Sequence, residues 1–211
     1  SDRAHWHRRL ATAIEERNPD SVEENAALIA EHLESAGDSY PAYAWHMRAS
    51  AWSADRDIGS ARVSWEHACR VADQLPADHP DQLSMRIAPR TMLCATAWQA
   101  RAVEESRGRS QTVIDLAAGD PAMGAGFGMG SPLAIAVAFR GVARWWQGYP
   151  GWQQDLHDAV AMARQSDPAT LGVVVTWTYG LAIRYGVRQA DASALRDIEE
   201  AVQTARSASG D

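Results

Sequence analysis

The chain contains no lysine, because all 20 of its basic residues are arginine. A P-loop needs a lysine on the nucleotide phosphates, and a pyridoxal enzyme needs one for its Schiff base, so the sequence excludes both chemistries. Cysteine is nearly absent as well. Cys69 and Cys94 lie far apart in the sequence and form neither a CxxC motif nor a disulfide framework, which fits a reducing compartment.

Long apolar runs and a surplus of basic charge are also missing. No run approaches the roughly 20 residues of a membrane-spanning helix, and the His- and Arg-rich start from Ser1 to Leu10 differs from a signal peptide. The net charge of −7 leaves no basic face that could follow a phosphate backbone. We therefore predict a cytoplasmic protein that binds neither membranes nor nucleic acid. Both ends lie within helical sequence, so we expect a segment of a longer protein.

The sequence is rich in helix-forming residues. Its 40 Ala residues favour helix, and apolar residues recur at helical rather than strand spacing. We predict an all-α protein of about ten helices joined by short connections, which make neighbouring helices antiparallel. A proline, Pro89, is expected to kink the fifth helix. The predicted helices are Arg3–Arg17, Ser21–Ala36, Tyr40–Ala54, Ile58–Leu75, Asp81–Ala102, Ser110–Ala118, Pro132–Gln147, Trp152–Gln165, Ala169–Tyr185 and Ala192–Ser207.

The helices repeat in pairs. A period of about 34 residues is typical of tetratricopeptide (TPR) repeats, in which small residues let two helices approach closely. Two stretches keep these spacings, and Ala49, Ala61, Ala182 and Ala194 occupy small-residue positions within them. A third stretch, from Phe139 to Pro168, keeps them with one residue inserted in its turn. We therefore predict one TPR-like α-solenoid domain over residues 1–211. It comprises a leading helix pair at 1–37 and repeat-like pairs at 38–78, 81–121, 132–168 and 169–208.

The nine tryptophans either fill the repeat stack or form a stacking platform for a ligand. Position favours the first role for four of them, because they occupy large-residue positions of the repeat and are expected to be buried. These are Trp45, Trp52, Trp65 and Trp146. Trp145 and Trp152 flank the turn of the third repeat, where they either rim a groove or close the turn by apolar packing.

Arg86 and Arg90 lie four residues apart on one helical face. They either hold an anion or pair with Asp78 or Asp81. With Trp145 and Trp152 they make up the candidate groove for a ligand or partner.

No other motif carries recognisable chemistry. The glycines from Gly124 to Gly130 lack the spacing of a dinucleotide fingerprint and follow no strand, so we predict a loop there rather than a phosphate site. Ser131 precedes Pro132 and is interpreted as a helix N-cap. The histidines show neither an HExxH motif nor a two-His, one-carboxylate spacing. The sequence thus predicts no catalytic, cofactor-binding or metal-binding residue.

Several strings resemble the helical region of a known class of bacterial proteins. They include His7-Arg8-Arg9-Leu10, Met85–Leu93 and Gly148-Tyr149-Pro150-Gly151-Trp152. The class comprises multidomain signalling proteins that join a class III nucleotide cyclase domain, a P-loop ATPase and TPR-like repeats, some with a LuxR-type DNA-binding domain. This resemblance implies that any cyclase or ATPase chemistry resides elsewhere in a longer polypeptide.

From these observations we expect a non-catalytic module for protein interaction or regulation, whose partner is another protein or a neighbouring domain of the same polypeptide. A sensor for a small-molecule inducer, bound in the concave groove of the solenoid, is the alternative.

Overall fold

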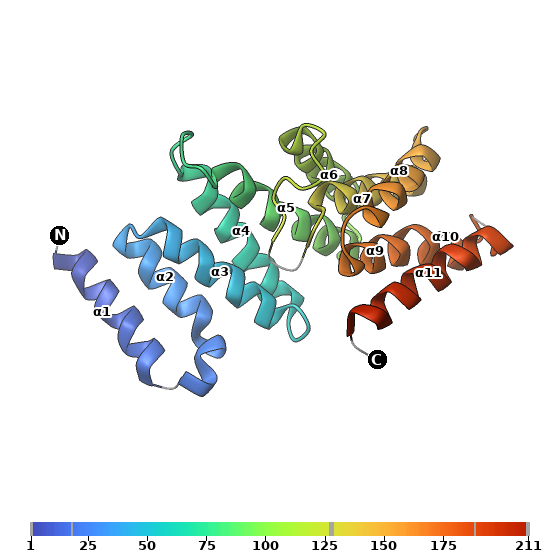
Figure 1. The fold of residues 1–211 in the computed structure, drawn as a ribbon. Coiled ribbons are helices and arrows are strands. Elements are labelled where there is room, and N and C mark those ends of the chain that lie inside the picture. The colour runs from blue at the N-terminus through green and yellow to red at the C-terminus, as the bar shows by residue number, and fades with distance from the viewer. Residues whose placement is uncertain (1, 18, 127–128, 188, 210–211) are drawn as a thin grey trace. The chain divides into compact units, whose positions relative to one another are not determined.

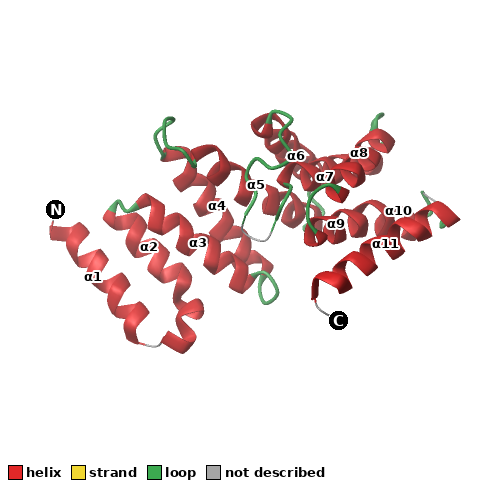
Figure 2. Cartoon of the chain, viewed as in Figure 1, coloured by secondary structure: helices red, strands yellow, loops and turns green. Residues whose placement is uncertain are grey.

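The computed structural model describes residues 2–17, 19–126, 129–187 and 189–209 (Figure 1). In these ranges every regular element is helical apart from one isolated bridge between Gly126 and Met129 (Figure 2). None of the described helices has both the length and the apolar character needed to span a membrane. The chain divides into two compact units, Ser1–Leu93 and Cys94–Asp211, and the division falls inside α5 (Gln82–Gln99).

Unit 1 consists of helices that pack on one another in chain order, α1 on α2, α2 on α3 and α3 on α4. One core cluster lies between α1, α2 and α3 and includes Ile29 and Trp45. A second lies between α3, α4 and α5 and includes Trp65 and Leu93. The elements are α1 (Asp2–Arg17), a 3-10 turn (Pro19–Asn25), α2 (Ala26–Ala36), α3 (Ser39–Ser53), α4 (Ile58–Gln74) and the first part of α5.

Unit 2 is centred on α7, which packs against α6, α8, α9 and the π turn that follows α9. Nearly every residue of α7 from Pro132 to Ala143 is buried, as expected for a helix that is apolar all round. Asp155 of α8 is buried too and accepts hydrogen bonds from Arg140 and Arg144 of α7 at 2.8–3.1 Å. Because its charge is paired, Asp155 ties these two helices together.

The elements of unit 2 follow the last turns of α5. They are α6 (Val103–Ala117), α7 (Pro132–Gln147), α8 (Trp152–Arg164), α9 (Pro168–Val175), a π turn (Thr176–Gly180), α10 (Leu181–Arg184) and α11 (Ala192–Ser209). From α9 through α10 the helical backbone continues without a break, as the predicted helix Ala169–Tyr185 required.

The small residues expected at close helix contacts are all buried. Ala49, Ala61, Ala182 and Ala194 are each at most 3% exposed. Removal of apolar surface from water is the main stabilising term in such contacts, and a methyl group there leaves room for the neighbouring backbone. Trp45 and Trp65 are buried as well, and Trp52 is partly buried.

Trp146 contradicts its predicted burial, because 55% of it is exposed. It lies in the last turn of α7, beyond the buried stretch, and its ring contacts other aromatic rings instead of a helix backbone. The repeat spacing identified a large residue at this position but could not show that the position is open to solvent.

Two helix starts also differ from the predictions. The segment predicted to begin a helix at Ser21 is a 3-10 turn, and the backbone of Ser21 is not helical (φ −123°, ψ 21°), so α2 begins only at Ala26. Conversely, α6 begins at Val103 rather than Ser110. Glu104 and Glu105 in its first turn favour a helix N-terminus, and their contacts with Arg107 and Arg109 support the helix across Gly108.

Candidate functional site

The most distinctive surface feature of unit 2 is a cluster of tryptophan and tyrosine rings. The ring centroid of Trp98 lies 5.9 Å from that of Trp146 and 6.5 Å from that of Trp177, both edge-on. Tyr185 contacts Trp146 in turn at 5.8 Å. Such edge-to-face pairs are favourable beyond the area they bury, so the rings hold one another in place.

These rings line a half-open pocket of about 390 Å³. Its wall is formed by Trp98, Gln99, Arg101, Val103, Trp146, Trp177, Leu181 and Tyr185. Trp146 and Tyr185 are each more than half exposed. Large aromatic residues that cluster on a surface instead of entering the core mark an interaction site.

The end of α5 positions Trp98 and Arg101. The N–H of Arg101 donates to the carbonyl of Trp98, and the N–H of Ala102 donates to the carbonyl of Ala97, each at 2.9 Å. This is the Schellman pattern, and it requires a left-handed residue at its turn, where glycine is usual. Here that residue is Arg101, with φ 61°. This strained, left-handed turn places the side chain of Arg101 at the pocket.

The π turn positions Trp177. Thr176–Gly180 adopts π-helical hydrogen bonding between α9 and α10, and such turns occur frequently at functional sites because they shift the direction of the residues they contain. Trp177 stacks on the buried Phe139 of α7, with ring centroids 4.7 Å apart. The floor of the pocket is thereby anchored in the core of unit 2.

Arg101 gives the pocket its charge. In the described part of the chain its side chain has neither a hydrogen bond nor an ion pair. The nearby Glu104 is engaged by Arg107 and Gln147, and these contacts lower the pKa of Glu104 below its ordinary value. The guanidinium of Arg101 is therefore available to an acidic group on a ligand.

The candidate residues in unit 2 lie next to this pocket or outside it. Trp145 packs on Trp146 and Tyr185, with centroids 5.9 Å apart in both pairs, but does not line the pocket. Trp152 lines a separate hollow of about 300 Å³ with Leu156 and Ala182. Of the two candidate tryptophans, Trp145 thus adjoins the pocket through Trp146, and Trp152 lies outside it.

Arg86 and Arg90 belong to unit 1, where both pair with Asp73 of α4. Asp73 takes the place of Asp78 and Asp81, the partners considered from the sequence. One carboxylate thus accepts a hydrogen bond from each of the two guanidinium groups and takes the place of a bound anion.

None of the residues that line the pocket, Trp98, Arg101 and Trp177 included, was selected as a site residue from the sequence. A signal for Trp177 exists, because Trp177, Leu181 and Tyr185 are spaced four residues apart and share one face of a helix. No sequence pattern of this kind predicts that Arg101 lies at the pocket, because its position depends on the left-handed turn at the end of α5.

The glycine-rich segment is a loop, as predicted, in the part that the structure describes; Phe127 and Gly128 lie outside the described residues. A side chain at Gly130 would clash with the carboxylate of Asp167, and that acid would repel a phosphate. Ser131 caps α7 as predicted, since its hydroxyl accepts a hydrogen bond from the N–H of Ala134 at 3.2 Å.

One group of side chains that could hold a metal ion was missed at the sequence level. Glu34, His46 and His67 of unit 1 bring their ligand atoms within 4.8 Å of one another. They lie on three different helices, so no motif spacing within one helix could reveal them.

Comparison of the chain with protein-family models, with curated proteins and with solved structures finds no match. A function for the chain must therefore be inferred from the pocket and its chemistry.

Proposed function

We propose that the chain is a non-catalytic binding module made of TPR-like helix pairs, and that unit 2 receives an apolar anchor side chain of a protein partner in its aromatic pocket. The observation that carries this proposal is the cluster of Trp98, Trp146, Trp177 and Tyr185 around one pocket, in which Trp146 and Tyr185 are half exposed. Interfaces are anchored by a few such aromatic residues.

The packing of the helices supports the repeat architecture. Helices α1 to α4 pack in chain order with short connections, and the alanines of the repeat pattern are buried. Short connections favour antiparallel helix pairs, which is the unit of an α-solenoid. Such arrays are binding scaffolds, and their function resides in the surface they present.

The chemistry of the pocket defines the anchor. Aromatic walls favour an aromatic or branched aliphatic side chain, and the unpaired guanidinium of Arg101 favours a carboxylate beside it. The preferred segment thus carries a residue such as Trp, Phe or Leu next to Asp or Glu.

The resemblance to multidomain signalling proteins supports a regulatory role. In that arrangement the partner is another protein or a neighbouring ATPase or cyclase domain of a longer polypeptide. Occupation of the pocket regulates that partner. The net charge of −7 argues against nucleic acid as the partner.

Selection from a random peptide library displayed on phage tests this proposal. Peptides recovered on the wild-type chain should share an apolar residue beside an acid, and Trp146→Ala should weaken their binding. Trp6→Ala is the matched control, because Trp6 is exposed to the same degree (56%) and lies on α1 of unit 1. Failure to enrich any common motif, or equal binding by Trp146→Ala, would refute the proposal.

A small-molecule sensor is the second candidate, because a volume of about 390 Å³ falls within the range of small-ligand pockets. The compounds that fit are aromatic carboxylic acids, with the ring among the tryptophans and the carboxylate on Arg101. A ligand that binds only the folded state raises the melting temperature by mass action. Thermal shift with a panel of such acids therefore separates the candidates, since the peptide-binding module shows no shift.

A further inference from the structure

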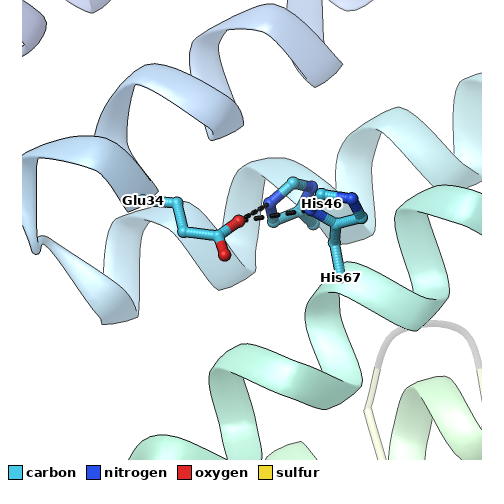
Figure 3. Close-up of side chains that lie close together, drawn as sticks. All are labelled: Glu34, His46 and His67. Carbon is cyan, nitrogen blue, oxygen red and sulfur yellow. Dashed lines mark hydrogen bonds and ion pairs between the residues drawn. The ribbon is translucent and has the colours of Figure 1, made fainter.

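Three side chains with metal-ligating atoms converge in unit 1. Glu34 comes from α2, His46 from α3 and His67 from α4, and Figure 3 shows the two imidazole rings directed toward the carboxylate. The Oε2 atom of Glu34 lies 3.1 Å from Nε2 of His46 and 3.2 Å from Nδ1 of His67. The rings lie 4.8 Å apart, centre to centre.

Two of the three separations between ligand atoms match those of a zinc site. Bonds of about 2.0–2.1 Å to nitrogen and oxygen, at tetrahedral angles, place the ligand atoms about 3.3 Å from one another. The two separations between Glu34 and the histidines are already near this value. The third separation is between the ligand nitrogens of His46 and His67. A small rotation of His67, which is 30% exposed, brings its nitrogen to the same distance from that of His46.

The surroundings hold the ligands and leave a way in. His46 is almost fully buried and fixed on α3, whereas Glu34 and His67 are each about 30% exposed. Arg70 approaches the other carboxylate oxygen of Glu34 at 3.8 Å and orients it. Partners of this kind around metal ligands set their geometry and affinity. Solvent reaches the open side, so an ion can enter and keep a water as its fourth ligand.

The charge states are also suitable. Burial favours the protonated form of Glu34, but its contacts with His67, His46 and Arg70 prevail and lower its pKa. Burial lowers the pKa of His46, against the opposing effect of Glu34. At neutral pH the group thus offers a carboxylate and a neutral imidazole, which are the forms that bind metal.

We propose that Glu34, His46 and His67 form a Zn²⁺ site that joins α2, α3 and α4. Two imidazoles and one carboxylate are a ligand set that Zn²⁺ favours, and the fourth position remains open to water. Zn²⁺ replaces the hydrogen bonds among the three side chains with bonds to one ion, and it binds only where the three helices are packed. The site therefore stabilises unit 1 when zinc is present.

The test uses the full chain without an affinity tag, treated with EDTA and then desalted. Titration calorimetry with ZnCl₂ should give one tight equivalent per chain, and circular dichroism should show a rise in melting temperature with zinc. Absence of a stoichiometric equivalent in the wild-type chain would overturn the proposal.

Variants of the three residues test whether the tightly bound zinc ion occupies this site. His67→Ala should lose both the tight equivalent and the zinc-dependent rise, and Glu34→Gln, which keeps the size and polarity of the side chain, should lose them too. Should His67→Ala lack the helical dichroism spectrum, His67→Gln takes its place. A cluster held only by hydrogen bonds predicts a different result, in which the variants melt lower in EDTA but respond to zinc as the wild type does.

The matched control is His32→Ala. The Nδ1 atoms of His7 and His32 lie 3.2 Å apart on α1 and α2, which makes this pair a competing site for zinc within unit 1. The variant should retain the equivalent and the rise in melting temperature. Loss of the equivalent in His32→Ala, with retention in His67→Ala, would assign the zinc to the pair and refute the proposed site.

Discussion

At the scale of the residue, Arg101 combines a strained backbone conformation with a guanidinium group that is available to a ligand. A left-handed conformation costs an L-residue roughly 1–2 kcal/mol relative to its usual conformations, and glycine avoids this cost. Arg101 nevertheless occupies the left-handed position at the end of α5 and lines the aromatic pocket. We infer that its side chain is retained for binding rather than for stability.

Arg101→Gly should therefore raise stability and weaken binding together. Relief of strain, offset in part by the greater freedom of glycine in the unfolded chain, gives an expected gain of about 0.5–1 kcal/mol in the free energy of unfolding in urea. Ala118→Gly is the control, because Ala118 has the same kind of left-handed conformation (φ 49°) at the end of α6. It should gain stability with unchanged peptide binding. Loss of stability in Arg101→Gly would contradict this account of the turn.

His46 makes the stability of unit 1 depend on pH. It faces Glu34 of α2 and both His67 and Arg70 of α4, and burial lowers its pKa in the folded chain. In the unfolded chain the imidazole of His46 takes up a proton near its ordinary pKa of 6.5, whereas in the folded chain it does so only at lower pH. Acidification therefore favours unfolding. The lowered pKa of Glu34 acts in the same direction, but only below about pH 4.5.

We accordingly expect the free energy of unfolding, measured with urea in EDTA, to fall between about pH 7 and about pH 5.5. His46→Phe should fall less, by up to about 1.4 kcal/mol per pH unit below 6.5. His5→Phe, at an exposed position of α1, is expected to follow the wild type. Parallel pH curves for His46→Phe and the wild type would show that the imidazole is not the titrating group.

At the scale of the element, the contact between α7 and α8 depends on one glycine. A side chain at Gly141 would lie 2.8 Å from Leu156 Cδ2 and 2.9 Å from Asp155 Cβ, which is closer than carbon atoms can approach. Gly141 thus permits the close packing that brings Asp155 to Arg140 and Arg144.

Gly141→Ala should consequently destabilise the chain by about 1–3 kcal/mol, because overpacking outweighs the better helix propensity of alanine. Gly108→Ala separates the two effects, since Gly108 is also helical but has no atom within 4 Å of the added methyl. That variant should gain about 0.5–1 kcal/mol. Urea unfolding of both variants measures the difference, and a stable Gly141→Ala would mean that α7 and α8 lie farther apart.

Most element boundaries followed from the sequence where the determinants are local. Ser131 and Pro132 define the start of α7, and Asp167 caps α9 with a hydrogen bond from Thr170 at 3.0 Å. The start of α6 did not follow, because it depends on the ion pairs that Glu104 and Glu105 form with Arg107 and Arg109 across Gly108. The π turn could not be predicted from the sequence either, because its hydrogen bonding does not change the spacing of the apolar residues.

At the scale of the whole molecule, the all-helical class could be predicted and the sites could not. The pocket gathers residues from the end of α5, the end of α7, the π turn and the segment after α10. The proposed zinc ligands Glu34, His46 and His67 likewise come from three helices. One signal was available for the latter, because His46 and His67 lie at similar distances in sequence from the turn between α3 and α4 and can therefore meet.

The division of the chain at Leu93 was not foreseen either. The two units meet within α5, a single helix that passes through Pro89. A proline removes one backbone donor from the helix, so the carbonyl of Met85 lacks its usual partner four residues on. The kink that the sequence predicts at Pro89 stays a prediction.

Titration calorimetry with a peptide recovered on the wild-type chain measures the contribution of the pocket most directly. Trp146→Ala removes a half-exposed ring at the pocket without opening the core. We expect it to weaken binding by about 2 kcal/mol, or roughly thirtyfold, as for an anchoring tryptophan at an interface. Trp6→Ala should bind as the wild type does. Equal affinities of Trp146→Ala and the wild type would contradict the account, because the peptide would then bind elsewhere.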